Sequence, residues 1–205
     1  RAVENGEVDI LVGTQMVTKG LDFDRVGLVG IMSADNLLSF PDFRANERAF
    51  QLIEQVAGRT GRRTSKGKVV IQAMKPRHSI IQLALNHDFT GMQAKELSVR
   101  QEYQYPPFVR LITITLKHRD QKLLQRAAGE FARSLHSKIG DRFLGPEFAP
   151  IARLKNLYQM QIIVKVDKGS IGAKVRERIK KSHQEVLLTP DFNRVKVVFD
   201  VDPNS

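Results

Sequence analysis

The sequence predicts an α/β unit with a parallel sheet, followed by a smaller α+β unit. Continuous apolar runs lie at residues 9–12, 26–32 and 69–71, and such runs are typical of parallel strands covered on both faces. After residue 108, apolar and polar residues alternate, which is typical of strands with one buried face. These observations indicate two architectures within the 205 residues.

In the first unit, a helix is predicted between the second and third apolar runs. Ala49, Leu52, Ile53 and Val56 follow the i, i+3, i+4, i+7 spacing of a buried helical stripe. Because the chemistry of open α/β sheets collects at the carboxyl ends of the strands, residues 14–22 after the first run are a candidate site.

The second unit follows a break in the pattern. We divide the chain into residues 1–75, a mostly helical connector at 76–108, and a last unit at 109–205, because Pro106 and Pro107 cannot continue a helix. The last unit has the order strand, helix, strand, strand, helix, strand, which predicts a split-βαβ fold with both helices on one face of one sheet. Its apolar positions are Ile112, Ile114 and Leu116; Leu124, Ala128, Phe131 and Leu135; Met160, Ile162, Val164 and Val166; Ile171, Val175 and Ile179; and Val195, Val197, Phe199 and Val201, with a short strand expected near Phe143.

Composition favours a polyanionic partner. The formal net charge is +11, and a basic surface attracts nucleic acid through phosphate contacts that release counterions. A merely well-solubilised basic protein fits the charge as well. The absence of cysteine excludes disulfides and thiolate metal sites. No apolar stretch approaches the length of a membrane span. The sequence opens on Arg1 rather than methionine, so we expect a piece of a longer protein.

Two arginines after the predicted helix form the sharpest motif. If the helical turn continues, Gln55, Arg59 and Arg62 lie at i, i+4 and i+7 on one face. Like charges stacked in this way repel each other, and an anion bound between them would turn this repulsion into a net attraction. Guanidinium groups match phosphate oxygens and stabilise the charge that develops in phosphoryl transfer. A solvated basic helix end is an equal alternative.

A second motif follows the first apolar run. Thr14 can donate to a phosphate from its hydroxyl and its backbone, and Asp22, two residues after Gly20, can accept from a ribose hydroxyl. An ordinary strand-to-helix connection with a capping threonine explains the same residues.

A third motif lies in the last unit. Arg153, Lys155 and Tyr158 combine two cations with an aromatic ring, a combination that suits single-stranded nucleic acid. Charged runs are usually only exposed to solvent, so a solvated surface without a binding role remains an alternative.

Missing motifs also matter. The sequence contains no G-x-x-x-x-G-K-[ST] loop to hold phosphates and Mg²⁺, and its five histidines have neither ligand nor triad spacing. We therefore expect no metal site and no independent catalysis.

The motifs together resemble a known family. Residues 13–23 and 55–62 look like motifs V and VI of superfamily 2 helicases, in that order. The wider set closely resembles the PriA family of replication-restart helicases (primosomal protein N′) over nearly the whole chain. It comprises Asp9–Met16 with Lys19-Gly20, Pro41–Ala45 with Glu47-Arg48, Gln51-Leu52, Gln55–Arg62, Tyr105–Phe108, Gly145-Pro146 with Ala149-Pro150, Arg153–Asn156 and Phe199–Pro203.

This resemblance implies a fold and an activity. Residues 1–75 would be most of a RecA-like helicase lobe 2, and the tail would be the C-terminal domain of the family. The intact protein would be an ATP-dependent DNA helicase that unwinds 3′ to 5′, binds stalled forks and helps to reload the replicative helicase in primosome assembly. The present chain alone would be inactive because the phosphate-binding lobe lies elsewhere.

The resemblance also implies site residues and ligands. The implied roles are γ-phosphate contact for Arg59 and Arg62, nucleotide contact for Gln55, Gly20 and Asp22, and DNA contact for Thr14, Gln15 and Lys19. ATP with Mg²⁺ would be bound mainly by the other lobe. Zinc would be bound by a cysteine insertion that precedes this chain, so none is expected here.

The implied partners are forked and single-stranded DNA, the acidic tail of single-stranded DNA-binding protein and other primosome proteins, without a membrane. The implied location is the cytoplasm, in association with the nucleoid. The rival interpretation is a stand-alone, non-catalytic nucleic-acid-binding module.

Overall fold

The computed structural model describes residues 7–13, 26–58 and 67–203, and the chain divides into two compact units, Arg1–Val99 and Arg100–Ser205. Each unit has its own hydrophobic core. The three-part division into residues 1–75, 76–108 and 109–205 stays a prediction.

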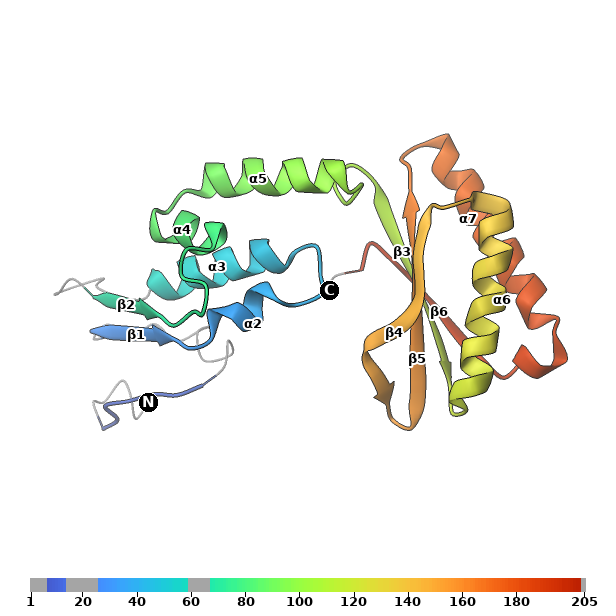
Figure 1. Ribbon diagram of the computed structural model, residues 1–205, viewed down its shortest axis with the longest axis horizontal. Helices are drawn as coiled ribbons and strands as arrows, with labels where there is room; N and C mark the ends of the chain where they lie inside the picture. Colours follow the sequence, from blue (N-terminus) through green and yellow to red (C-terminus); the bar gives the residue numbers. More distant parts are fainter. Residues whose placement is uncertain (1–6, 14–25, 59–66, 204–205) are drawn as a thin grey trace. The chain divides into compact units, whose positions relative to one another are not determined.

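Unit 1 contains a two-stranded parallel sheet packed against helices. Strand β1 (Leu28–Ile31) pairs in parallel with β2 (Lys68–Ile71), as the apolar runs predict. The helices are α2 (Ala34–Leu38), α3 (Ala45–Ala57), α4 (Ser79–Leu85) and α5 (Phe89–Glu102), which continues past the end of the unit (Figure 1).

The predicted stripe of α3 is confirmed. Ala49, Ile53 and Val56 are buried, and Leu52 is partly buried against them. Their spacing puts them on the side of the helix that faces β1, β2 and α4. This core fixes the helix whose last turn carries Gln55.

Two expectations for the first sheet are wrong. Residues 9–12 form no strand, and Ile10 and Val12 are 80% and 84% exposed. An apolar run becomes a strand only when a neighbouring strand satisfies its backbone, and the described part of the chain offers this segment no such partner. The expected cover on both faces is also not observed, because Leu28 is 60% exposed and Val70 is 45% exposed.

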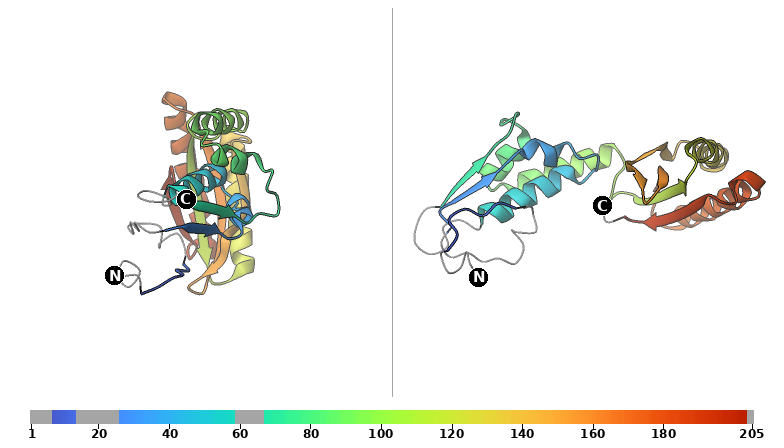
Figure 2. Two further views of the ribbon diagram at one scale, coloured as in Figure 1. Left: turned by 90° about the vertical axis from the view of Figure 1, so that its left-hand side faces the viewer. Right: turned by 90° about the horizontal axis from the view of Figure 1, so that it is seen from below.

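Unit 2 is a four-stranded antiparallel sheet with two long helices. Its elements in chain order are β3 (Arg110–His118), α6 (Gln121–Ile139), β4 (Phe143–Leu154), β5 (Leu157–Val166), α7 (Ser170–Leu187), a 3₁₀ turn (Pro190–Phe192) and β6 (Lys196–Val201). The strand order is β4-β5-β3-β6. Both helices lie on one face of the sheet (Figures 1 and 2).

Period-two alternation forms the core of this unit. Ile114, Leu116, Ile162 and Val164 point to the helix-covered face and are fully buried. They meet the apolar stripe of α6, which includes Phe131. The other face of the sheet carries mostly polar partners, as one-sided alternation requires.

Strand β4 is longer than expected. The expected short strand near Phe143 extends to Leu154, with register shifts after Leu144 and after Phe148. Gly145 lies at the first shift with φ +93°, and a Cβ there would approach the Gln161 carbonyl oxygen to 2.6 Å. The backbones come this close only because the residue is glycine.

Candidate nucleic-acid interface

The hairpin between β4 and β5 presents basic residues at its tip. Lys155 and Asn156 form a two-residue turn with φ +49° and +62°. A turn with both central residues at positive φ matches the twist of the flanking strands. Asn accepts this backbone conformation readily, whereas Lys adopts it rarely. The turn therefore holds the exposed Lys155 at the very end of the hairpin.

Next to the turn, Arg153 and Tyr158 form a directly opposed cross-strand pair. The Arg153 guanidinium lies 5.1 Å from the centre of the Tyr158 ring, and its Nη2 is 3.4 Å from Asn156 Oδ1. A guanidinium over a ring is a flat cationic platform. Tyr158 also packs against the core, which anchors that platform.

The three candidate residues of the last unit are thus brought together. Arg153 and Lys155 are exposed and Tyr158 is half-buried. A planar cation can stack on a base, and a lysine at the turn can contact a phosphate. The arrangement suits a strand of nucleic acid that lies across the hairpin tip.

In unit 1, Gln55 lies half-buried in the last full turn of α3. The helix ends at Ala57, and Gly58 donates its N–H to the Glu54 carbonyl at 2.9 Å. The other candidate residues of this unit lie outside the described residues: Arg59, Arg62, Thr14, Gln15, Lys19, Gly20 and Asp22. Their roles stay predictions.

The start of α3 is held by residues from the motif that precedes it. Asp42 Oδ1 accepts from the Arg44 backbone N–H at 3.0 Å, and Asp42 Oδ2 lies 2.8 Å from Arg48 Nη2. The Asp42 side chain is only 5% exposed. The Arg48 side chain is 37% exposed, so the buried partner is the carboxylate, and removing Arg48 would leave its charge without this cation. This part of the motif therefore positions the helix that carries Gln55.

Lys165 makes a second basic–aromatic contact, near the other end of the unit 2 sheet. Its Nζ lies 4.7 Å from the centre of the Tyr105 ring and donates to the Tyr103 carbonyl at 2.7 Å. Burial lowers the pKa of Lys165. Lys165 is thus partly buried within its own unit, whereas Arg153 and Lys155 are exposed.

Sequence analysis did not single out His118. The strand register places His118 directly opposite Tyr158, in the same row as Arg153. The available signal was the polar run Lys117–Lys122, which ends an otherwise alternating strand. Such a run predicts a strand end, but it does not predict which strand lies beside it.

Two family profiles match the chain. The profile described as "Primosomal protein N C-terminal domain" matches residues 101–204, and the profile described as "Helicase conserved C-terminal domain" matches residues 1–64. The chain is 38% identical over 200 residues to the replication restart protein PriA of Bacillus subtilis (strain 168), covering 94% of this chain and 25% of that protein. The chain belongs to the PriA family.

Two other PriA proteins match the chain at a similar level of identity. The chain is 39% identical over 206 residues to the replication restart protein PriA of Synechocystis sp., covering 98% of this chain and 24% of that protein. For the Thermotoga maritima relative the identity is 36% over 162 residues, covering 79% of this chain and 22% of that protein. The chain thus spans about a quarter of the length of these PriA proteins. Among the helices that the structure describes in this PriA-family chain, none combines the length and apolarity needed to cross a membrane.

Proposed function

We propose that this chain is the C-terminal part of an ATP-dependent DNA helicase that unwinds DNA 3′ to 5′ in replication restart and primosome assembly. One observation carries the proposal. The similarity to proteins named replication restart protein PriA extends over 94% and 98% of the chain and includes a helicase C-terminal domain.

In this proposal, the first unit completes a nucleotide site whose phosphate loop lies on another lobe. Arg59 and Arg62 contact the γ-phosphate and stabilise the charge that develops in the transition state. Gln55, held by α3, lies beside them, and Gly20 and Asp22 contact the nucleotide. The well-packed core of α3 supports the proposal, since side chains that stabilise a transition state must be rigidly positioned.

ATP would arrive with Mg²⁺, which supplies Lewis-acid stabilisation of the phosphates when bound. Among the described residues, no three His, Asp or Glu side chains are grouped so that they could hold a metal ion. The roles proposed for this chain are to bind and orient the nucleotide and the DNA and, for Arg59 and Arg62, to stabilise the charge of the transition state. Zinc is assigned to the remainder of the full-length protein.

DNA is proposed to contact both units. Thr14, Gln15 and Lys19 contact the strand from unit 1. In unit 2, the hairpin tip contacts it through Arg153, Lys155 and Tyr158. The distance of 5.1 Å between the Arg153 guanidinium and the Tyr158 ring centre supports this role. We assign the element order and strand order of unit 2 to the split-βαβ class.

Protein partners are proposed on grounds of charge. A net charge of +11 attracts the acidic tail of single-stranded DNA-binding protein, and other primosome proteins complete the assembly.

The decisive experiment compares arginine variants in the full-length protein. Arg59→Ala or Arg62→Ala is expected to lower the kcat of DNA-stimulated ATP hydrolysis by roughly 10³–10⁵, the range known for arginine fingers. Arg63→Ala is the matched control, because this neighbouring arginine lies off the predicted face and its loss should change kcat little.

The isolated 205-residue chain should bind DNA without hydrolysing ATP. Wild-type turnover in both Arg59→Ala and Arg62→Ala would remove the motor role. A full-length protein without an ATPase lobe would favour the non-catalytic binding module.

A further inference from the structure

One end of the unit 2 sheet gathers basic side chains that are far apart in the sequence. The register places Arg153, Tyr158 and His118 in one row across β4, β5 and β3. Neighbouring strands lie about 4.8 Å apart, so this row spans about 10 Å. The last strand of the sheet, β6, begins at the same end, because its Lys196 pairs with Lys117.

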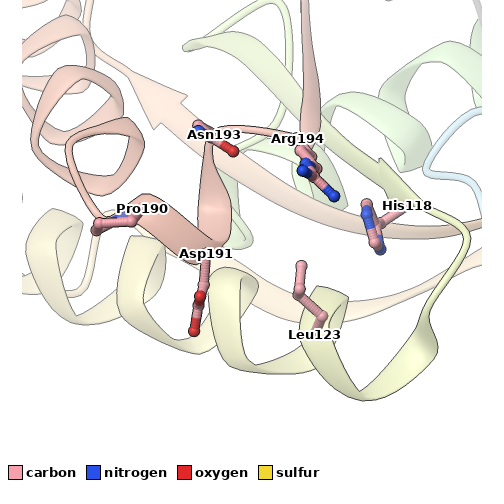
Figure 3. Close-up of a pocket in the computed structure, with 6 residues that line it drawn as sticks. All are labelled: His118, Leu123, Pro190, Asp191, Asn193 and Arg194. Carbon is pink, nitrogen blue, oxygen red and sulfur yellow. The ribbon is translucent and has the colours of Figure 1, made fainter.

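Beside His118 the row opens into a pocket (Figure 3). The cavity has a volume of about 320 Å³ and is lined by His118, Leu123, Pro190, Asp191, Asn193 and Arg194. That space is ample for a phosphate group. Its walls come from the end of β3, the first turn of α6 and the loop that leads into β6.

The polar groups of the pocket favour an anion. Figure 3 shows the Arg194 guanidinium beside the His118 imidazole, while the Asp191 carboxylate points away from both. Asp191 is paired with Arg126 at 3.3 Å. No hydrogen bond or ion pair engages the Arg194 side chain within the described part of unit 2. Its charge is therefore available to a ligand.

The tautomer of His118 adds a second donor. The Asp120 backbone N–H donates to His118 Nδ1 at 3.0 Å. The Asp120 carbonyl oxygen also lies 3.3 Å from Nδ1. Because the shorter contact comes from a backbone N–H, which can only donate, we assign Nδ1 as the acceptor, and the proton of the neutral ring is then on Nε2. Asp120 itself is occupied as the cap of α6, accepting from the Leu123 N–H at 3.0 Å. Of the two nearby carboxylates, Asp120 is thus engaged by the first turn of α6, and Asp191 is engaged by Arg126.

Further cations lie at this end of the sheet. Arg119 and Lys122 are exposed on the turn into α6, next to the lining residues His118 and Leu123. Lys117 and Lys196 are directly opposed on adjacent strands, but they lie on the face of the sheet opposite to His118, because side chains alternate along a strand. Arg119 and Lys122 therefore add to the positive charge near the pocket, and counterions released from a phosphate backbone would favour binding there.

We propose that this end of the sheet binds the sugar–phosphate backbone of single-stranded DNA, with one phosphate in the pocket between Arg194 and His118 Nε2. The strand continues along the row toward the Arg153–Tyr158 platform, where a base stacks. The proposal deepens the proposed function, on which it rests for the choice of DNA as the ligand. It assigns Arg194 and His118 as phosphate contacts that place the strand without reading its sequence.

The test measures binding of fluorescent oligothymidylate to the 205-residue chain as a function of salt. Arg194→Ala is expected to weaken binding about fivefold near 0.1 M salt, and to make the slope of log K against log salt shallower by about 0.7, as for one lost phosphate contact. The control is Arg133→Ala, which removes the same charge from the exposed face of α6, where Arg133 pairs only with Glu130 among the described residues. Its affinity and slope should stay close to wild type.

Two further measurements complete the test: one checks the folding of the variant and the other identifies the ligand. The thermal unfolding midpoint of Arg194→Ala should match wild type, because Arg194 is exposed, which removes misfolding as an explanation. In NMR spectra, the ring signals of His118 should shift on addition of oligothymidylate at micromolar concentration. Inorganic phosphate should shift them only at much higher concentration, and an acidic peptide should leave them unchanged.

Equal salt slopes for Arg194→Ala and Arg133→Ala would overturn the pocket assignment, as would a His118 response to the peptide and not to DNA. A third outcome separates the pocket from the proposed function. If the wild-type chain binds DNA, and DNA affinity falls in Arg153 variants but not in Arg194→Ala, the pocket assignment is wrong. The hairpin contact of the proposed function is then still supported. The motor role depends on the separate ATPase comparison of Arg59 and Arg62.

Discussion

Asn46 Nδ2 donates a 2.9 Å hydrogen bond to Glu96 Oε1, which ties the start of α3 to α5 across fifty residues of sequence. Glu96 is only 5% exposed, and a carboxylate is tolerated at such a depth only when donors satisfy it. The contact supports α3 at the end opposite to Gln55, so it helps to orient the helix that leads to the candidate nucleotide residues.

Asn46→Leu should therefore destabilise unit 1. Removing the amide leaves part of a buried carboxylate unsatisfied, which costs about 1–3 kcal/mol. Urea unfolding of the chain measures the loss. Gln51→Leu is the control, since Gln51 lies on the same helix and donates to Glu47 at 3.2 Å in an exposed position. Its effect should stay within about 0.5 kcal/mol. Equal losses for both variants would contradict the structural role of the Asn46–Glu96 contact.

Ile114→Ala should lower the stability of unit 2 by about 2–5 kcal/mol, because it opens a cavity in a packed core. Ile114 is 0% exposed, between the sheet and α6. Val198→Ala is the matched control, because Val198 lies on the other face of the sheet and is 37% exposed. Chemical denaturation compares the two, and a similar cost for both would contradict the one-sided core.

The core of unit 2 could be predicted because one-sided alternation is a local signal. Ile112, Ile114 and Leu116 alternate with polar residues, and the structure buries all three on one face. The full length of β4 could not be predicted. Its register shifts and mostly exposed residues erase the alternation beyond Phe143.

The segment at residues 9–12 shows the limit of apolar runs. A run of Ile10, Leu11 and Val12 has the same composition whether it is buried or exposed, and the structure leaves it exposed. Its state depends on which segment of chain lies beside it, and local sequence does not carry that information.

Only part of the candidate interface could be predicted from the sequence. Arg153 and Tyr158 flank a two-residue turn, so their proximity follows from hairpin geometry. His118 and Arg194 line one pocket because β6 pairs with β3. That proximity is a property of strand order and could not be predicted from spacing.

The cap of α6 predicts a pH dependence. The backbone N–H of Leu123 donates to the Asp120 carboxylate and lowers its pKa below the ordinary value of 3.8. Because the folded pKa is lowered, the ionised cap stabilises the fold above pH 3.8, and this contribution is lost as the pH falls through the lower folded value. Asp120→Asn keeps an acceptor at the cap but removes the titration.

The thermal midpoint of Asp120→Asn should thus lie near wild type at pH 7 and fall less steeply than wild type in acid. Asp120→Ala, which has no acceptor, should be destabilised at both pH values. Parallel pH profiles for wild type and Asp120→Asn would show that the cap carboxylate contributes no pH dependence.

A last prediction concerns the Arg153–Tyr158 platform. It distinguishes the effect of the planar shape of the Arg153 side chain from the effect of its charge. Arg153→Lys keeps the cation but loses the flat guanidinium that can stack on a base. Stacking contributes about 1–3 kcal/mol per base in single-strand binding, so the Kd for oligothymidylate should rise roughly five- to 140-fold. The salt slope should stay unchanged, because the number of phosphate contacts is the same. Arg133→Lys is the control and should leave the Kd as it is. A lower salt slope with only a small change in Kd would mean that Arg153 contacts a phosphate, and the base-stacking role of the hairpin would then be wrong.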